Sequence, residues 1–257
     1  MTLTLTVRAQ PPGRVDAAPL IPERLRGLHA SAVGGPSLRC GREHLTVGDL
    51  FEVSGAGTEE EELVLAGDLR RFDGIGAGMS RGEIVVRGDV GTWAGAGMSG
   101  GVLRIFGDAG ARLGAAYPGA RVGMTGGEIV VSGDTGEEAG AGMRRGLLAV
   151  GGRTGSGAGL RMLAGTVIAL GGIGPEAGLG NKRGSLVSGR PVEPPPAYGF
   201  ATRFHPPALG LQLRRARELG LTVDDALLRG TWARWSGDRT ELIRGEILIF
   251  DDGEVGR

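Results

Sequence analysis

Five of the six methionines in this 257-residue chain recur at regular positions. Intervals of 19, 26, 19 and 19 residues separate Met79, Met98, Met124, Met143 and Met162. Each lies in a glycine-rich phrase, and the phrase recurs a sixth time as EAGLGNKRG at 176–184, where Asn181 takes the methionine position. A fixed period of this size is typical of stacked units that bury their apolar residues only against one another. The chain is therefore expected to contain an array of six units.

Each unit also contains a short apolar string that ends in glycine, such as ELVLAGD at 62–68 and EIVVRGD at 83–89. The length and the β-branched content of these strings predict strands rather than helices. Aligning the units places aliphatic residues in two columns, two residues apart, which predicts parallel strands in register with one face buried. Several intervening residues are apolar as well, among them Val85, Val130 and Ile168. We therefore expect another surface to cover part of the outer face.

The 52 glycines, most of them within the array, predict tight corners, because glycine adopts positive φ without a Cβ clash. Asp68, Asp89, Asp108 and Asp134 follow corner glycines, where a carboxylate can accept hydrogen bonds from nearby turn amides. A methionine thioether is flexible and polarizable, so it suits the irregular space beside such corners. The methionine column is therefore expected to lie in the interior.

The third unit is 26 residues long because it contains the insertion AAYPGAR at 115–121. We expect Tyr117 and Pro118 to lie in a protruding loop. Loops on one face of a repeat array commonly contact partners, so these two residues are a candidate partner loop.

Other structural interpretations of the glycine-rich phrases agree less well with the sequence. Calcium-binding nonapeptide repeats carry a GGxGxD signature, and hexapeptide repeats place an aliphatic residue at every sixth position; neither pattern is present. A disordered glycine-rich segment would lack the ordered apolar columns. A dinucleotide fold needs its GxGxxG string once, before a helix, whereas here similar spellings occur in nearly every unit.

Composition narrows the functional classes. The formal net charge is zero, which argues against a nucleic-acid partner. No apolar run approaches the ~18 residues of a membrane span, and the N-terminal residues do not resemble a secretory signal, so a cytoplasmic protein without a membrane partner is expected. Cys40 is the only cysteine, and the three histidines are scattered without metal-ligand spacing. We expect no catalytic, cofactor-binding or metal-binding residue in this chain.

Three regions are expected along the sequence. Residues 1–60 form a leader and cap with a short helix at 22–28, and residues 61–189 form the array. Residues 190–257 comprise a proline-rich exit, a helix at 206–220 and C-terminal strands. That helix places Leu209, Leu213 and Ala216 on one face, and the final strands carry Trp232 and Trp235 toward an apolar contact.

The glycine-x-glycine-x-glycine units, together with PLIPERL at 19–25 and VGDLFEV at 47–53, resemble the C subunit of formylmethanofuran dehydrogenase. They are equally similar to the C subunit of its bacterial relative, the formyltransferase/hydrolase complex of methylotrophs. The same repeat resembles the carboxy-terminal domain of the glutamate synthase large subunit. The resemblance implies an all-β fold, a right-handed parallel β-helix of about six to seven coils of ~19 residues with short helical flanks.

The resemblance also implies a function: a non-catalytic scaffold in a four-subunit complex whose other subunits are catalytic. In the bacterial complex, a formyl group moves from formyl-tetrahydromethanopterin to a methanofuran-type carrier and is released as formate. Both carriers, and any metal ions, are expected in partner subunits. Arginine-rich composition and the PLIPERL leader favour this complex over the archaeal tungsten or molybdenum dehydrogenase; a glutamate-synthase-like domain is the second alternative. Arg144, Arg145, Lys182 and Arg183 are candidate contacts for the carrier's anionic tail.

Overall fold

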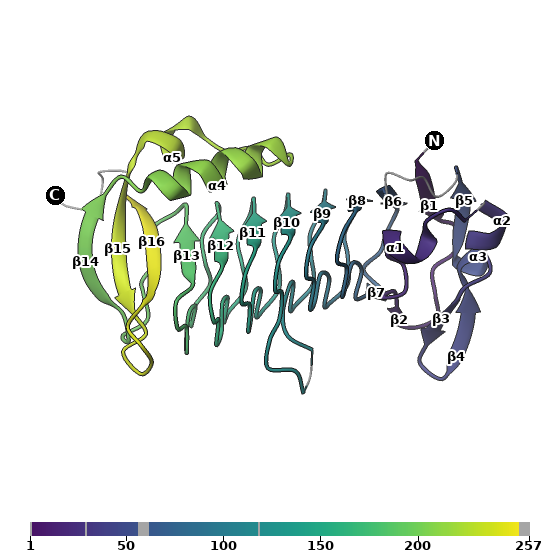
Figure 1. Ribbon diagram of the computed structural model, residues 1–257, viewed down its shortest axis with the longest axis horizontal. Coiled ribbons are helices and arrows are strands. Elements are labelled where there is room, and N and C mark those ends of the chain that lie inside the picture. The colour runs from purple at the N-terminus through teal and green to yellow at the C-terminus, as the bar shows by residue number, and fades with distance from the viewer. Residues whose placement is uncertain (1, 29, 56–61, 118, 252–257) are drawn as a thin grey trace.

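The computed structural model describes residues 2–28, 30–55, 62–117 and 119–251. A 12-stranded sheet has the order β14-β15-β16-β13-β12-β11-β10-β9-β8-β6-β1-β5, and a second sheet has the order β4-β3-β2-β7 (Figure 1). The elements, in chain order, are β1 (Leu3–Val7), β2 (Val15–Asp16), α1 (Pro22–Leu25), α2 (Ala30–Val33), β3 (Ser37–Cys40), β4 (Glu43–Thr46), α3 (Val47–Leu50), β5 (Phe51–Ser54), β6 (Glu62–Ala66), β7 (Phe72–Asp73), β8 (Glu83–Arg87), β9 (Val102–Ile105), β10 (Glu128–Val131), β11 (Leu147–Val150), β12 (Thr166–Ala169), β13 (Ser185–Ser188), β14 (Gly199–Phe204), α4 (Pro207–Glu218), α5 (Asp225–Arg229), β15 (Thr231–Gly237) and β16 (Gly245–Asp251).

Equivalent strands of the repeated units lie side by side in parallel, as the alignment predicts. Leu63 of β6 lies opposite Ile84 of β8, and Ile84 lies opposite Leu103 of β9. The register continues through β13, and every member of this column is at most 1% exposed. Burial of this aliphatic column is the main force that stacks the units. The predicted strands and their register are confirmed.

The methionine column is buried, as predicted. Met79, Met98, Met124, Met143 and Met162 have no exposed surface. Thioethers of the column reach toward the next unit, as two examples show: a Cβ built on Gly127 would lie 2.7 Å from the Cε atom of Met98, and one on Gly146 would lie 2.7 Å from that of Met124. Glycine at these positions therefore makes room for the methionine of the preceding unit.

The corner aspartates join successive units. The Asp89 carboxylate accepts a hydrogen bond from the Asp108 backbone N–H (2.8 Å), Asp108 accepts one from the N–H of Asp134 (2.8 Å), and Asp134 accepts one from Arg153 (2.7 Å). The prediction that these carboxylates accept from turn amides is confirmed. The amide, however, belongs to the following unit, so the interaction fixes the stacking of units and not only the local turn.

The predicted right-handed parallel β-helix is wrong as a description of this structure. Such a fold needs extended strands on the return path of every coil, but here only one face of the units forms a continuous sheet. Elsewhere the described units are joined by isolated bridges, such as Leu69 with Val90 and Val90 with Ala109, and by backbone hydrogen bonds between turns. The return path bends through glycines with positive φ, including Gly74 (72°) and Gly76 (71°), which interrupt extended backbone. The architecture is a long mixed sheet, a four-stranded sheet and a few helices.

The two ends of the long sheet are antiparallel. At one end, β1 pairs in parallel with β6, and β5 closes the edge by pairing antiparallel with β1. At the other end, β16 pairs in parallel with β13 before β15 and β14 reverse direction. Strand β5, which belongs to the region expected to form a leader and cap, thus lies at the sheet edge, but the place of β1 was not foreseen. Residues 56–61 lie outside the described residues, so the division at 60/61 stays a prediction, as does that at 189/190.

The predicted C-terminal elements are confirmed. Helix α4 lies over β10 to β13 (Figure 1). Leu209, Leu213 and Ala216 of this helix belong to one buried cluster with outward residues of the strands, including Val130 and Ile168. This helix is the covering surface that the apolar outward positions indicate. Strands β15 and β16 follow, and Trp232 is 1% exposed with its ring centroid 5.3 Å from that of Phe250.

Candidate interaction surface

The glycine-x-glycine-x-glycine turns form a surface of their own, because each turn stacks on the next through backbone hydrogen bonds. The Gly74 N–H donates to the Thr92 carbonyl (2.9 Å), and the Gly95 N–H donates to the Ile75 carbonyl (2.8 Å). A Cβ on Gly95 would lie 2.4 Å from the Cδ1 atom of Ile129, and its φ is 61°. This position therefore requires glycine, both for space and for backbone conformation.

Side chains replace the first glycine of the turn in several units. Trp93, Arg112 and Glu138 adopt φ values of 65°, 65° and 59°, a region that costs an L-residue roughly 1–2 kcal/mol. They contact one another: the Arg112 guanidinium lies 4.9 Å from the Trp93 ring centroid, and its Nε donates to Glu138 Oε2 (2.9 Å). A ladder of aromatic and charged side chains thus runs across three units and offsets part of the backbone strain.

Tyr117, from the predicted partner loop, packs onto this ladder. Its ring is stacked on that of Trp93, with centroids 5.6 Å apart and planes 14° apart. Burial raises the pKa of Tyr117, and the nearby Asp16 carboxylate adds to the effect. The loop is therefore anchored to its own chain through Tyr117, which remains 38% exposed. Pro118 lies outside the described residues, and a partner contact by this loop stays a prediction.

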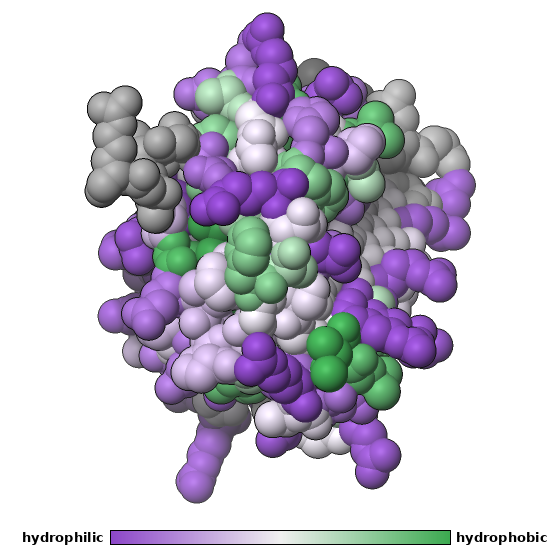
Figure 2. Space-filling view, turned by 90° about the vertical axis from the view of Figure 1, so that its left-hand side faces the viewer, coloured by the Kyte–Doolittle hydropathy of each residue, from purple (hydrophilic) through white to green (hydrophobic). Residues whose placement is uncertain are grey.

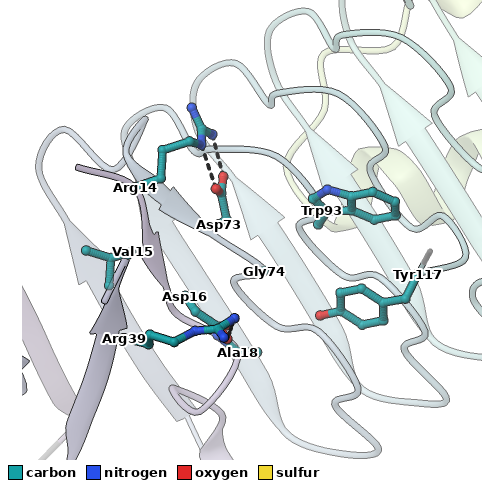
Figure 3. A pocket seen from close by; sticks show the side chains of 10 residues that line it. Arg14, Val15, Asp16, Ala18, Arg39, Asp73, Gly74, Trp93 and Tyr117 are labelled. Atoms are coloured by element: carbon teal, nitrogen blue, oxygen red, sulfur yellow. Dashed lines mark hydrogen bonds and ion pairs between the residues drawn. The ribbon is translucent and has the colours of Figure 1, made fainter. Parts of the chain in front are cut away.

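A cleft of about 400 Å³ lies between the leader and the first units (Figure 3). Arg14 binds Asp73 through two hydrogen bonds, one of them from Nε to Oδ2 (2.6 Å), and Arg39 lies 3.8 Å from Asp16. Burial acts to raise the pKa of Asp73, but hydrogen bonds from Arg14 and Thr92 outweigh it, so this pKa lies below its usual value. Each arginine of this cleft faces a carboxylate, so the cleft offers no excess charge to an ionic ligand.

A second depression, of about 670 Å³, is lined in part by Ala116, Ala120 and Arg121 from the inserted loop and its start. We call it the basic groove. Residues at its base include Ala141, Leu160, Leu163 and Leu179, and its charged lining residues are Arg121, Arg161, Lys182 and Glu241. Lys182 Nζ lies 3.7 Å from Glu241 Oε2, whereas Arg121 and Arg161 form no ion pair with a described carboxylate. The groove therefore combines an apolar base with excess positive charge.

Of the four predicted anionic-tail residues, one, Lys182, is among those that line this groove. Arg144 and Lys182 occupy the same position in their units, directly after the methionine slot, with Leu163 in that position between them. Lys182 lines the groove, and Arg144, Arg145 and Arg183 are exposed. Their role stays a prediction. Sequence reasoning missed Arg121 and Arg161, although Arg161 stands where most other units have the third glycine, a signal that was available.

Metal and membrane sites are not apparent in the part of the chain that the structure describes. Within the described ranges, His, Cys, Asp and Glu side chains form no group of three or more that could hold a metal ion. No described helix has the length and apolar content needed to cross a bilayer.

Comparison with known proteins identifies the relatives of this chain. No protein-family model matches it. It is 41% identical over 88 residues to the C subunit of the formyltransferase/hydrolase complex Fhc of Methylorubrum extorquens, and 32% identical over 91 residues to the C subunit of tungsten-containing formylmethanofuran dehydrogenase 2 of Methanothermobacter wolfeii. These alignments span 34% of this chain in both cases, and 32% and 34% of the respective relatives, so they cover about a third of each protein.

The structural match extends over nearly the whole chain. A chain in the crystal structure of the formyltransferase/hydrolase complex (FhcABCD) from Methylorubrum extorquens, in complex with methylofuran, superposes with a TM-score of 0.80. The two chains are 32% identical, and the match covers 96% of this chain and 98% of the other. The resemblance to the C subunits of these two complexes is thus confirmed. This chain belongs to the family formed by the C subunits of formyltransferase/hydrolase and formylmethanofuran dehydrogenase complexes.

Proposed function

We propose that this chain is the scaffold subunit of a formyltransferase/hydrolase complex and holds catalytic partner subunits in a fixed arrangement. One observation carries the proposal: nearly the whole chain, at 32% identity, matches a chain of the four-subunit FhcABCD complex. Identity of 41% over 88 residues to the C subunit of that complex supports the same assignment. The extended sheet suits this role, since a rigid element with two distinct ends can separate two partners.

The reaction proposed for the complex is formyl transfer from formyl-tetrahydromethanopterin to a methanofuran-type carrier, followed by release of formate. In this scheme the carriers and any metal ions bind to partner subunits. The related complex contains methylofuran, which supports a carrier of that type. Arg144, Arg145, Lys182 and Arg183 would attract an anionic tail of the carrier, because all four are cations on one group of turns and Arg144 and Lys182 share a column.

Reconstitution tests the assignment. The full chain is co-expressed with the three other subunits of a formyltransferase/hydrolase complex, purified through a tag on one of them, and assayed for formate release from formyl-tetrahydromethanopterin. We expect this chain to co-purify in a fixed ratio and its omission to lower the yield or activity of the complex. A chain that never co-purifies and whose omission leaves activity unchanged contradicts the proposal.

A second candidate is the C subunit of a tungsten-containing formylmethanofuran dehydrogenase. The 32% identity to the Methanothermobacter wolfeii protein favours this alternative. Metal analysis of the native assembly separates the two: tungsten or molybdenum with iron–sulfur clusters supports the dehydrogenase, and their absence from a formate-releasing assembly supports the transferase/hydrolase.

A further inference from the structure

The basic groove differs from the first cleft in both charge and surface character. The first cleft pairs each arginine with an aspartate, whereas the groove has three cations and one carboxylate among its lining residues. Lys182 is the cation that faces Glu241. An anionic group that enters the groove would therefore meet Arg121 and Arg161 without displacing an ion pair between described residues.

Arg161 adopts a strained backbone conformation that contacts within its own chain do not require. The equivalent position is glycine in four other units, Gly78, Gly97, Gly142 and Gly180, but Arg161 adopts φ 53° there. Its stem lies across the next turn, since a Cβ on Gly180 would be 3.2 Å from Arg161 Cγ. Trp93, Arg112 and Glu138 contact one another in similarly strained positions, but Arg161 is exposed and forms no ion pair with a described carboxylate. Strain of this kind is commonly retained where a residue serves a binding site.

The apolar base of the groove favours an occupant that carries apolar side chains. Leu160, Leu163 and Leu179 are all partly exposed there, and the position of Leu160 and Leu179 is alanine in the first four units. The loop at 238–244 supplies Glu241 to the groove and continues with Leu242 and Ile243, which are 52% and 56% exposed. Figure 2, which views the β14 end of the molecule, shows apolar patches separated by polar side chains on that end. A purely anionic chain would leave the leucines of the groove in contact with water.

We propose that the basic groove is the docking site for an acidic, amphipathic segment of a partner subunit, whose apolar side chains cover Leu160, Leu163 and Leu179 while its carboxylates meet Arg121 and Arg161. The occupant is argued from charge complementarity and from the apolar base, a combination typical of protein interfaces. This inference rests on the proposed function, because it assigns a surface of the scaffold to one of its partners.

Two groove variants and two matched controls test the proposal in the co-expressed complex. One groove variant is Leu163→Arg with Leu179→Arg, and the other replaces Arg121, Arg161 and Lys182 by glutamine. The controls, Leu211→Arg and Arg214→Gln, change an exposed leucine and an exposed arginine of α4, which does not line the groove. Thermal unfolding of each isolated chain verifies folding; if the double-arginine variant does not fold, the glutamine variant carries the test.

We expect both groove variants to bind the partner subunits at least tenfold more weakly than the wild type, and both controls to bind within twofold of it. Raising the salt concentration should weaken binding of the wild type but have little effect on the glutamine variant. Groove variants that assemble like the wild type would overturn this inference while leaving the scaffold role intact. Groove variants that assemble normally but have a raised KM for the carrier would also overturn it, because the groove would then bind the carrier's anionic tail. Failure of the wild-type chain to assemble would contradict the proposed function as well.

Discussion

Replacing Asn181 by methionine restores the residue that five other units have at this position, and we nevertheless expect it to destabilise the protein. The buried Asn181 amide donates from Nδ2 to the Gly184 carbonyl (2.9 Å) and accepts at Oδ1 from the Gly184 N–H (2.7 Å). The equivalent glycines of the earlier units are partly exposed, so water can reach their N–H groups, whereas Gly184 is buried. The start of β16 lies against it, with the Glu246 N–H donating to the Gly184 carbonyl (3.0 Å).

The magnitude follows from these contacts. Leaving the buried Gly184 N–H without a partner costs about 1–3 kcal/mol. A Cβ on Gly245 would lie 2.6 Å from Asn181 Nδ2, so there is little room for a longer side chain, and overpacking costs about another 1–3 kcal/mol. For a chain of this size, 1 kcal/mol corresponds to a change of about 2–4 °C in Tm. We therefore expect Asn181→Met to lower the Tm by at least about 4 °C.

Urea unfolding and calorimetry of the full chain measure the effect. Asn181→Leu has a branched side chain of similar shape, so it separates the lost hydrogen bonds, about 1–3 kcal/mol, from the added length. Met162→Leu in the neighbouring unit is the control, with an expected cost below about 1.5 kcal/mol. If Asn181→Met is as stable as the wild type or more so, the amide is not what stabilises this end of the array, and the reasoning from buried hydrogen bonds fails.

Three further changes test other parts of the structure. Arg161→Gly should leave the free energy of unfolding unchanged or raise it by up to about 1 kcal/mol, because it removes backbone strain. A clear loss of stability in urea unfolding would contradict the conclusion that the backbone at Arg161 is strained. Leu213→Ala should cost about 2–5 kcal/mol in the same assay, since this fully buried side chain joins α4 to the sheet, and a loss below about 1 kcal/mol would argue against that packing. Burial raises the pKa of Tyr198 to about 12, and Asp238 adds to the effect. The unfolded chain therefore loses this proton first, so stability should fall by roughly 1.4 kcal/mol per pH unit between about pH 10 and 12. Tyr198→Phe should remove that part of the pH dependence, and an unchanged slope would refute it.

The parts of the fold that the sequence predicts are those set by local periodicity. The aliphatic columns, the buried methionines and the apolar face of α4 follow from side-chain spacing alone, and the apolar outward residues Val130 and Ile168 correctly indicated a cover. The closed helical architecture was wrong because spacing locates strands and turns but does not show whether the return path is extended. Positive φ at glycines such as Gly74 and Gly76 limits the units to one continuous sheet.

Contacts between distant segments were the least predictable. The alternating residues of β1 indicate a strand, but nothing in its sequence shows that it pairs with β6. Strands β2 to β5 and three helices separate β1 from β6 along the chain. The stacking of Tyr117 on Trp93 depends on how an inserted loop folds back, which spacing does not encode. The groove could be inferred in part: Lys182 was a candidate, but Arg121 comes from that same loop and only the folded chain brings it beside Arg161 and Glu241.

Strand β6 pairs in register with β8, and the same register continues from β8 to β13, so the length of the long sheet changes one strand at a time. Every additional strand moves the β5 edge and the β14 edge apart by about 4.8 Å, the spacing of neighbouring strands. The antiparallel strands at both edges differ from the repeated ones, so gain or loss of a 19-residue unit in the middle would leave either edge unaltered. Molecules bound at the two edges would then be held at a separation that changes only in steps of about 4.8 Å.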